Sequence, residues 1–127
     1  MPRKTHHRQE DAANIKKLGS CITAALKKKA FDVIALDVRT FTSVADYFVI
    51  CSGSSNRQTQ AIAESIELDL KKHGFRALGI EGFTHGSWIL LDYGDIVMHV
   101  FYQPVRDFYG LERLWADAPK VSLPGPE

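Results

Sequence analysis

The sequence has only two cysteines, no long apolar run and no apolar stretch at its start. Cys21 and Cys51 lie far apart and lack the spacing of metal ligands, so we expect both to be buried free thiols in a reducing compartment. No window approaches the run of about 18 apolar residues that a membrane helix needs. A secretory signal would need an apolar stretch near the N-terminus. These absences predict a cytoplasmic protein without a membrane span.

Neither sign of charge is in excess, because 16 Lys and Arg residues stand against 15 Asp and Glu residues. Proteins that bind nucleic acid directly usually carry a basic excess. The balance therefore predicts no direct nucleic acid binding. If the protein works near RNA, we expect its direct partner to be a protein.

The sequence also lacks the spaced motifs of common enzymes and metal sites. Its five histidines include no pair four residues apart on a predicted helix, which is the spacing that many zinc sites use. A phosphate-binding P-loop, a dinucleotide fingerprint and a G-x-S-x-G nucleophile motif are all missing from the sequence. We expect no catalytic residue, no metal and no cofactor.

The best remaining candidate for chemistry is the turn SGSSN at residues 52–56, between a predicted strand and a predicted helix. Backbone amides at a helix N-terminus can hold a phosphate, and nucleotidyltransferases use a Gly-Ser turn followed by paired carboxylates. Glu67 and Asp69 follow at a suitable distance, but positions i and i+2 of a helix point nearly opposite ways. We favour a strand exit and helix cap, with a degenerate nucleotidyltransferase-like, nucleotide-binding protein as the alternative.

The apolar pattern predicts one domain in which helices and strands are intermixed. We expect helices at 9–30, 54–74 and 105–119, and strands at 31–38, 46–53, 75–82 and in a hairpin at 87–101. This order predicts an α/β (α+β) fold with a mixed sheet and helices mainly on one face. The predicted organisation is a disordered N-terminus at 1–8, one domain at 9–118 and a flexible C-terminal tail at 119–127.

The hairpin SWILLDYGDIVMHVF has two unlike faces. A two-residue turn at Tyr93 and Gly94 would set Asp92 opposite Asp95 and Trp88 opposite His99. Because side chains alternate along a strand, one face is an apolar core surface made of Ile89, Leu91, Ile96, Met98 and Val100. The other face carries Trp88, Leu90, Asp92, Asp95, Val97, His99 and Phe101.

Two interpretations of this second face remain open. Exposed apolar side chains beside two aspartates are typical of a docking patch, and like charges set opposite each other would not be favoured by folding alone. Alternatively, the C-terminal segment covers Trp88, and the aspartates are simply solvated at a loop tip. The segment RDFYGLERLW at 106–115 adds weight to docking, since a short element is too small to bury all its aromatic and leucine side chains.

Three stretches together resemble the ribosomal silencing factor family, also called Iojap-related. They are DYFVICSGSSNRQ at 46–58, WILLDYGDIVMHVF at 88–101 and FYGLERLWADA at 108–118, and the resemblance runs from about the first helix to Ala118. It implies a nucleotidyltransferase-like fold without catalytic carboxylates. It also implies a non-enzymatic factor that binds the large ribosomal subunit through its fourteenth protein. Such binding would block subunit joining and repress translation under nutrient limitation, while organellar relatives act in large-subunit assembly.

The family motifs and the hairpin faces together predict a partner-binding surface. Its residues are Trp88, Leu90, Asp92, Tyr93, Asp95, Val97, His99, Tyr109 and Glu112. The acidic members would receive basic residues of the ribosomal partner, and the apolar members would anchor it. The same surface could pair two copies of the chain, so we also expect a homodimer that competes with ribosome binding.

Overall fold

The computed structural model describes residues 8–122, with side chains from residue 13 onward. The predicted disordered N-terminus lies outside these residues except for its last position, and so do the last five residues of the predicted tail. The elements are α1 (Arg8–Lys27), β1 (Phe31–Asp37), β2 (Tyr47–Gly53), α2 (Asn56–Lys72), β3 (Gly79–Glu81), β4 (Trp88–Asp92), β5 (Ile96–Tyr102), α3 (Gln103–Tyr109) and α4 (Leu111–Leu114). Among the described helices, none is both long and apolar enough to span a bilayer.

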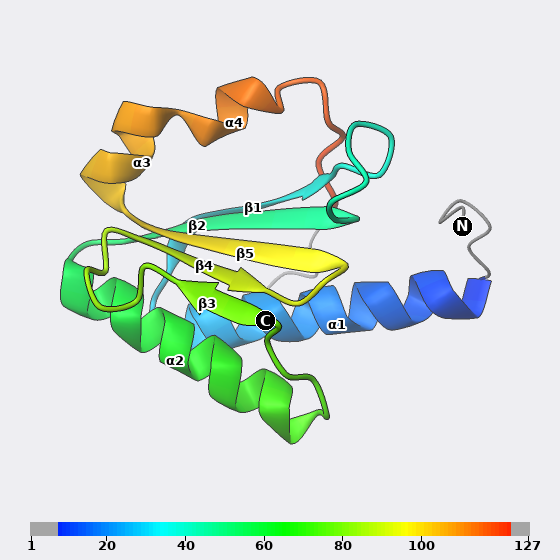
Figure 1. Ribbon diagram of the computed structural model, residues 1–127, viewed down its shortest axis with the longest axis horizontal. Coiled ribbons are helices and arrows are strands. Elements are labelled where there is room, and N and C mark those ends of the chain that lie inside the picture. Colours follow the sequence, from blue (N-terminus) through cyan, green and yellow to red (C-terminus); the bar gives the residue numbers. More distant parts are fainter. Residues whose placement is uncertain (1–7, 123–127) are drawn as a thin grey trace.

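The five strands form one mixed sheet in the order β1-β2-β5-β4-β3. β2 and β5 pair in parallel, whereas the other neighbouring strands pair antiparallel. The two long helices, α1 and α2, cover one face of this sheet, and the short helices α3 and α4 lie over the other face (Figure 1). The predicted α+β fold with a mixed sheet is confirmed.

The long helix α2 begins and ends at residues that suit a helix terminus. The side chain of Ser55 accepts a hydrogen bond from the Gln58 N–H and caps the start of α2. Beyond the end of α2, Gly74 adopts a φ of 89°, a conformation that glycine adopts without steric cost. Along α2, Ile62 and Ile66 point into the core, as the four-residue spacing predicts.

The sheet separates two apolar clusters. The larger one lies under α1 and α2 and takes alternate residues of β2, such as Val49 and Cys51. The smaller one lies on the side of α3 and α4 and takes the intervening β2 residues, Phe48 and Ile50. Since β2 is buried along its whole length, this strand is central to both clusters.

Residues 119–122, which the sequence places in a flexible tail, run beside the edge strand β1. The Asp37 N–H donates to the Pro119 carbonyl over 2.8 Å, and the Val121 N–H donates to the Ala35 carbonyl over 2.8 Å. An edge strand has unpaired backbone groups, which this segment satisfies. The side chain of Val121 also packs against the larger cluster.

The predicted hairpin register is wrong by two residues. Asp92 lies opposite Val97, and Trp88 lies opposite Phe101. The turn residues are Gly94 and Asp95, because the Tyr93 N–H donates to the Ile96 carbonyl over 2.8 Å. A carboxylate oxygen of Asp92 accepts from the Gly94 N–H over 2.8 Å and fixes this turn. A shift of two residues leaves the side chains within β4 and β5 on their predicted faces, whereas Asp95 moves into the turn.

Candidate docking surface

The second face of the hairpin is covered by the C-terminal segment. Val97, His99 and Phe101, all predicted on an open patch, are buried in the smaller apolar cluster or beside it. The Trp88 ring lies 4.7 Å from the Phe101 ring and 5.2 Å from the Tyr109 ring of α3, measured between centroids. The second interpretation of this face, with Trp88 beneath the C-terminal segment, therefore describes its packing correctly.

His99 is surrounded by aromatic side chains, and one of its ring nitrogens accepts a hydrogen bond. The indole N–H of Trp88 donates to Nδ1 of His99 over 3.2 Å, and the other ring nitrogen finds no partner among the described residues. Burial lowers the pKa of His99 to about 4, so the ring is neutral near pH 7. Val97 and His99 support the surface from beneath and are not accessible to a partner in this arrangement.

Tyr93 and Asp95 point toward the long helices instead of the docking side. Tyr93 is buried in the larger cluster, and burial raises the pKa of its hydroxyl. Asp95 accepts a hydrogen bond from Nζ of Lys17 in α1 over 2.8 Å. The expectation that Asp92 and Asp95 repel each other across the turn is wrong, since Asp92 lies opposite Val97 and bonds to the backbone of Gly94.

A group of exposed large apolar side chains lies on α3 and α4. Phe108, Tyr109 and Leu114 have exposed fractions of 79%, 56% and 77%. Partly exposed apolar side chains adjoin them on β4 and at the start of α4. We call this surface the docking platform, and its residues are Trp88, Leu90, Phe108, Tyr109, Leu111 and Leu114.

Sequence reasoning missed Phe108 and Leu114 as site residues. Their signal was already visible, because neighbouring large apolar residues on a short helix cannot all face one sheet. Once Trp115 packs edge-on against Phe48 at 5.0 Å, the adjacent Leu114 must point elsewhere. Leu90, Asp92 and Tyr109, all predicted, lie at or near this platform and are partly or largely exposed.

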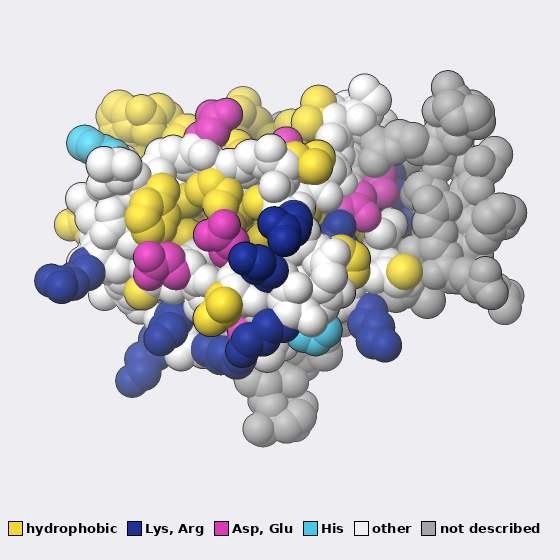
Figure 2. Space-filling model, turned by 60° about the horizontal axis from the view of Figure 1, so that its bottom comes forward, with side chains coloured by type: hydrophobic (Ala, Val, Ile, Leu, Met, Phe, Trp, Pro, Cys, Tyr) yellow, Lys and Arg dark blue, Asp and Glu magenta, His cyan; other side chains and the backbone are white. Residues whose placement is uncertain are grey.

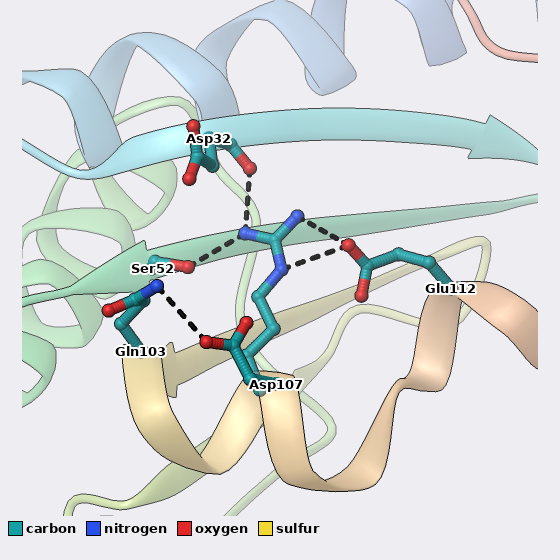
Figure 3. Close-up of polar contacts among 6 residues, drawn as sticks. Asp32, Ser52, Gln103, Asp107 and Glu112 are labelled. Atoms are coloured by element: carbon teal, nitrogen blue, oxygen red, sulfur yellow. Dashed lines mark hydrogen bonds and ion pairs between the residues drawn. The ribbon is translucent and has the colours of Figure 1, made fainter.

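A buried arginine holds α3 and α4 to the sheet, and sequence reasoning missed it. The guanidinium of Arg106 contacts three other elements, through Asp32, Ser52 and Glu112, which are labelled in Figure 3. Its Nη1 donates to the Asp32 carbonyl and to the Ser52 hydroxyl, each over 2.7 Å. Its Nε and Nη2 donate to one carboxylate oxygen of Glu112 over 3.1 and 2.8 Å.

Glu112 is therefore already engaged within the chain. Partial burial raises the pKa of Glu112, but the hydrogen bond and charge of Arg106 outweigh this effect and hold the pKa below its usual range. A polar cleft of about 470 Å³ opens beside this pair, lined by Asp32, Val33, Ile34, Ser52, Gln103, Arg106, Asp107 and Glu112. Among the described side chains, those of residues 13–122, no cluster of three His, Cys, Asp or Glu could hold a metal ion.

In the SGSSN turn, Ser54 uses both of its donors within the chain. The backbone N–H and the hydroxyl of Ser54 both donate to the side-chain oxygen of Gln58, over 2.6 and 2.7 Å. The side-chain nitrogen of Gln58 in turn donates to the carbonyls of Lys28 and Lys29 at the end of α1. Ser54 is thus bonded to Gln58, which links the start of α2 to the residues after α1, and this favours the structural interpretation of the turn.

The two carboxylates that follow the turn, Glu67 and Asp69, have separate surroundings, as expected for positions i and i+2 of a helix. Asp69 accepts a hydrogen bond from Nζ of Lys27 over 2.7 Å, while Glu67 is exposed on α2.

The fold and its surfaces together define the class of protein. It is a single-domain α+β protein with an exposed aromatic and aliphatic platform on one side of its sheet.

Comparisons with known proteins give the family. The family model described as "Ribosomal silencing factor during starvation" matches residues 10–127. A Bacillus subtilis protein named ribosomal silencing factor is 46% identical over 96 residues, covering 76% of this chain and 81% of its own length. The chain belongs to the ribosomal silencing factor family.

A solved structure and a more distant relative agree with this assignment. The crystal structure of a protein from Chromobacterium violaceum matches with a TM-score of 0.77 and 38% identity, covering 90% of this chain and 92% of the other. A mouse protein named "Mitochondrial assembly of ribosomal large subunit protein 1" is 32% identical over 92 residues, covering 70% of this chain and 40% of its own length.

Proposed function

We propose that this chain is a silencing factor that binds the large ribosomal subunit and sterically prevents the small subunit from joining it. One observation carries the proposal: a member of this family presents Phe108, Tyr109 and Leu114 to solvent on one side of the sheet. Large exposed apolar side chains grouped on one surface are typical of protein docking sites. The name of the mouse relative supports the large subunit as the target.

The finer proposal is that the platform docks on the fourteenth protein of the large subunit, in the cytoplasm, when nutrients are scarce. The direct contacts are made by the docking platform with Asp92 at its rim. Glu112 contributes through Arg106, and Val97, His99 and Phe101 support Trp88 and Leu90 from beneath. Blocking a joining surface requires a stable complex in the right place, and no bond of the partner has to be made or broken.

The same platform also suits pairing of two copies in the free protein. Exposed aromatic side chains on a rigid surface can bury each other as well as a partner. We propose that such a homodimer competes with ribosome binding. A free protein that sediments as a monomer at every concentration would contradict this pairing.

The test of the function is co-sedimentation with isolated large subunits, followed by addition of small subunits. We expect the wild type to sediment with large subunits and to reduce the joined particles. Replacing both Phe108 and Leu114 by Ser should weaken binding by roughly a hundredfold, as loss of two interface anchors does. The fold should survive, because neither side chain lies in the apolar clusters.

The matched control replaces two exposed aliphatic residues of the long helices by Ser, on the other face of the sheet. Ile15 on α1 and Leu68 on α2 have exposed fractions of 46% and 56%. This pair should leave binding unchanged. If both double variants bind as the wild type does, the platform is not the docking surface. If the wild type itself does not sediment with the large subunits, the proposed function is wrong.

A further inference from the structure

The geometry points to Arg106 as the positioning residue of the docking platform, acting without contact to the partner and making Glu112 an indirect contributor. This inference rests on the proposed function, because it concerns how the same surface is held ready to bind. It assigns a role to a side chain that an inspection of the surface would not find, because the Arg106 side chain is only 7% exposed.

The two short helices need an external contact to fix their place. α3 has seven residues and α4 has four, lengths at which an isolated helix is not stable in water. Within residues 8–122, neither helix start receives a side-chain cap. Their position on the sheet must therefore come from packing and from polar contacts with other elements.

Arg106 supplies these polar contacts to three separate elements. It bonds to the backbone of Asp32 in β1, to the hydroxyl of Ser52 in β2 and to the carboxylate of Glu112 in α4. Figure 3 shows these partners, with Asp32 and Ser52 on two paired strands and Glu112 on α4. A planar guanidinium can donate in several fixed directions at once, which a lysine ammonium on its flexible stem does not reproduce.

The bond between Arg106 and Glu112 spans the joint between the two helices. Gly110 lies between them with a φ of 58°, a left-handed conformation that favours glycine. The Gly110 N–H also donates to the Arg106 carbonyl over 2.9 Å. Because the ion pair crosses this joint, it fixes the angle at which α4 leaves α3.

The platform side chains flank this joint. Phe108 and Tyr109 precede Gly110 on α3, and Leu111 and Leu114 follow it on α4. Fixing the joint therefore holds both halves of the platform in one arrangement, with Tyr109 against Trp88. A surface ordered before binding loses less conformational entropy when the partner arrives. Loss of Arg106 should thus weaken docking without removing any side chain that touches the partner.

A double-mutant cycle on large-subunit binding tests this role. Arg106→Gln and Glu112→Gln should each weaken binding about tenfold, and the double variant should be no weaker than the worse single variant. Arg57→Gln is the matched control, because it changes an exposed arginine on α2 in the same way. Its binding should equal that of the wild type.

Spectroscopy supplies a readout that does not depend on the ribosome. The near-ultraviolet circular dichroism of Trp88 and Trp115 should change in Arg106→Gln, while the far-ultraviolet spectrum and cooperative unfolding of the sheet and long helices persist. If Arg106→Gln does not fold, the same spectra are measured on Glu112→Gln, which changes the more exposed member of the ion pair.

The outcomes separate this inference from the proposed function. If Glu112→Gln weakens binding equally with and without Arg106, the glutamate contacts the partner directly and the inference is overturned. Binding of Arg106→Gln at wild-type strength would overturn it too. If the wild type does not bind large subunits, the proposed function fails, and an unchanged aromatic spectrum in Arg106→Gln would then refute the positioning role independently.

Discussion

At the scale of single residues, His99 shows how a polar side chain becomes part of a core. The rings that surround it, Trp88, Phe48 and Phe101, are uncharged, and its Nδ1 already accepts the indole N–H of Trp88. A protonated ring would carry a hydrogen on that nitrogen and would place a charge among aromatic side chains. The folded protein therefore resists protonation of His99.

This resistance predicts a loss of stability in mild acid. The pKa of His99 falls from about 6.5 in the unfolded chain to about 4 in the folded one, so between these values the unfolded chain binds more protons. Stability should be unaffected by His99 above pH 6.5 and should fall as the pH drops toward 4, by up to roughly 3 kcal/mol. Urea unfolding at pH 7 and pH 5 measures the change.

The control for this prediction is His99→Phe, which removes the titrating group and keeps an aromatic ring. The variant should lose less stability than the wild type between pH 7 and pH 5. An equal loss in both proteins would show that other groups, and not His99, cause the acid sensitivity.

At the scale of elements, the alternating pattern of the hairpin predicts which face each strand residue lies on, but it does not predict the register of the two strands. Alternation of apolar and polar residues correctly assigned Ile89 and Leu91 to the core face. The register depended on turn chemistry, because the Asp92 carboxylate accepts from Gly94 and moves the turn one position along the chain. Two candidate turns of equal length could not be distinguished by alternation, since both leave the faces unchanged.

The long helices and central strands were predictable because each has a local signal, a cap or an apolar period. The burial of Val97 and His99 beneath the C-terminal segment was not predictable, since it depends on where α3 and α4 pack. Arg106 was missed for a related reason. An arginine on a short predicted helix gives no sign that it will reach two strands distant in the sequence.

The turn gives a prediction in which one substitution has opposite effects at two glycines. Gly94→Ala should lower the free energy of unfolding by about 1 kcal/mol, because Gly94 has a φ of 86° that alanine adopts with strain. Gly19→Ala should raise it by roughly 0.5–1 kcal/mol, since Gly19 is inside α1 and an added methyl meets nothing within 4 Å. Equal effects of both substitutions in chemical denaturation would contradict the turn assignment.

At the scale of the whole molecule, the near-zero net charge hides a separation of charge. The layer of the long helices, residues 13–29 and 54–76, has nine Lys and Arg but three Asp and Glu. The remaining described residues, 30–53 and 77–122, have four Lys and Arg but nine Asp and Glu. Figure 2 shows the basic side chains spread over the centre and lower part of the face that α1 and α2 form. The docking platform thus belongs to the acidic side of the molecule.

This separation predicts which carboxylates matter for docking on a basic partner. Asp92→Asn with Asp107→Asn should weaken binding to large subunits about tenfold and reduce its dependence on salt. Asparagine at position 92 keeps an oxygen for the Gly94 N–H, so the turn should remain intact. The control neutralises Glu64 and Glu67 on α2 by changing both to Gln, and its binding should stay within about twofold of the wild type. A larger loss in the α2 variant would mean that the basic layer of helices, and not the platform, faces the ribosome.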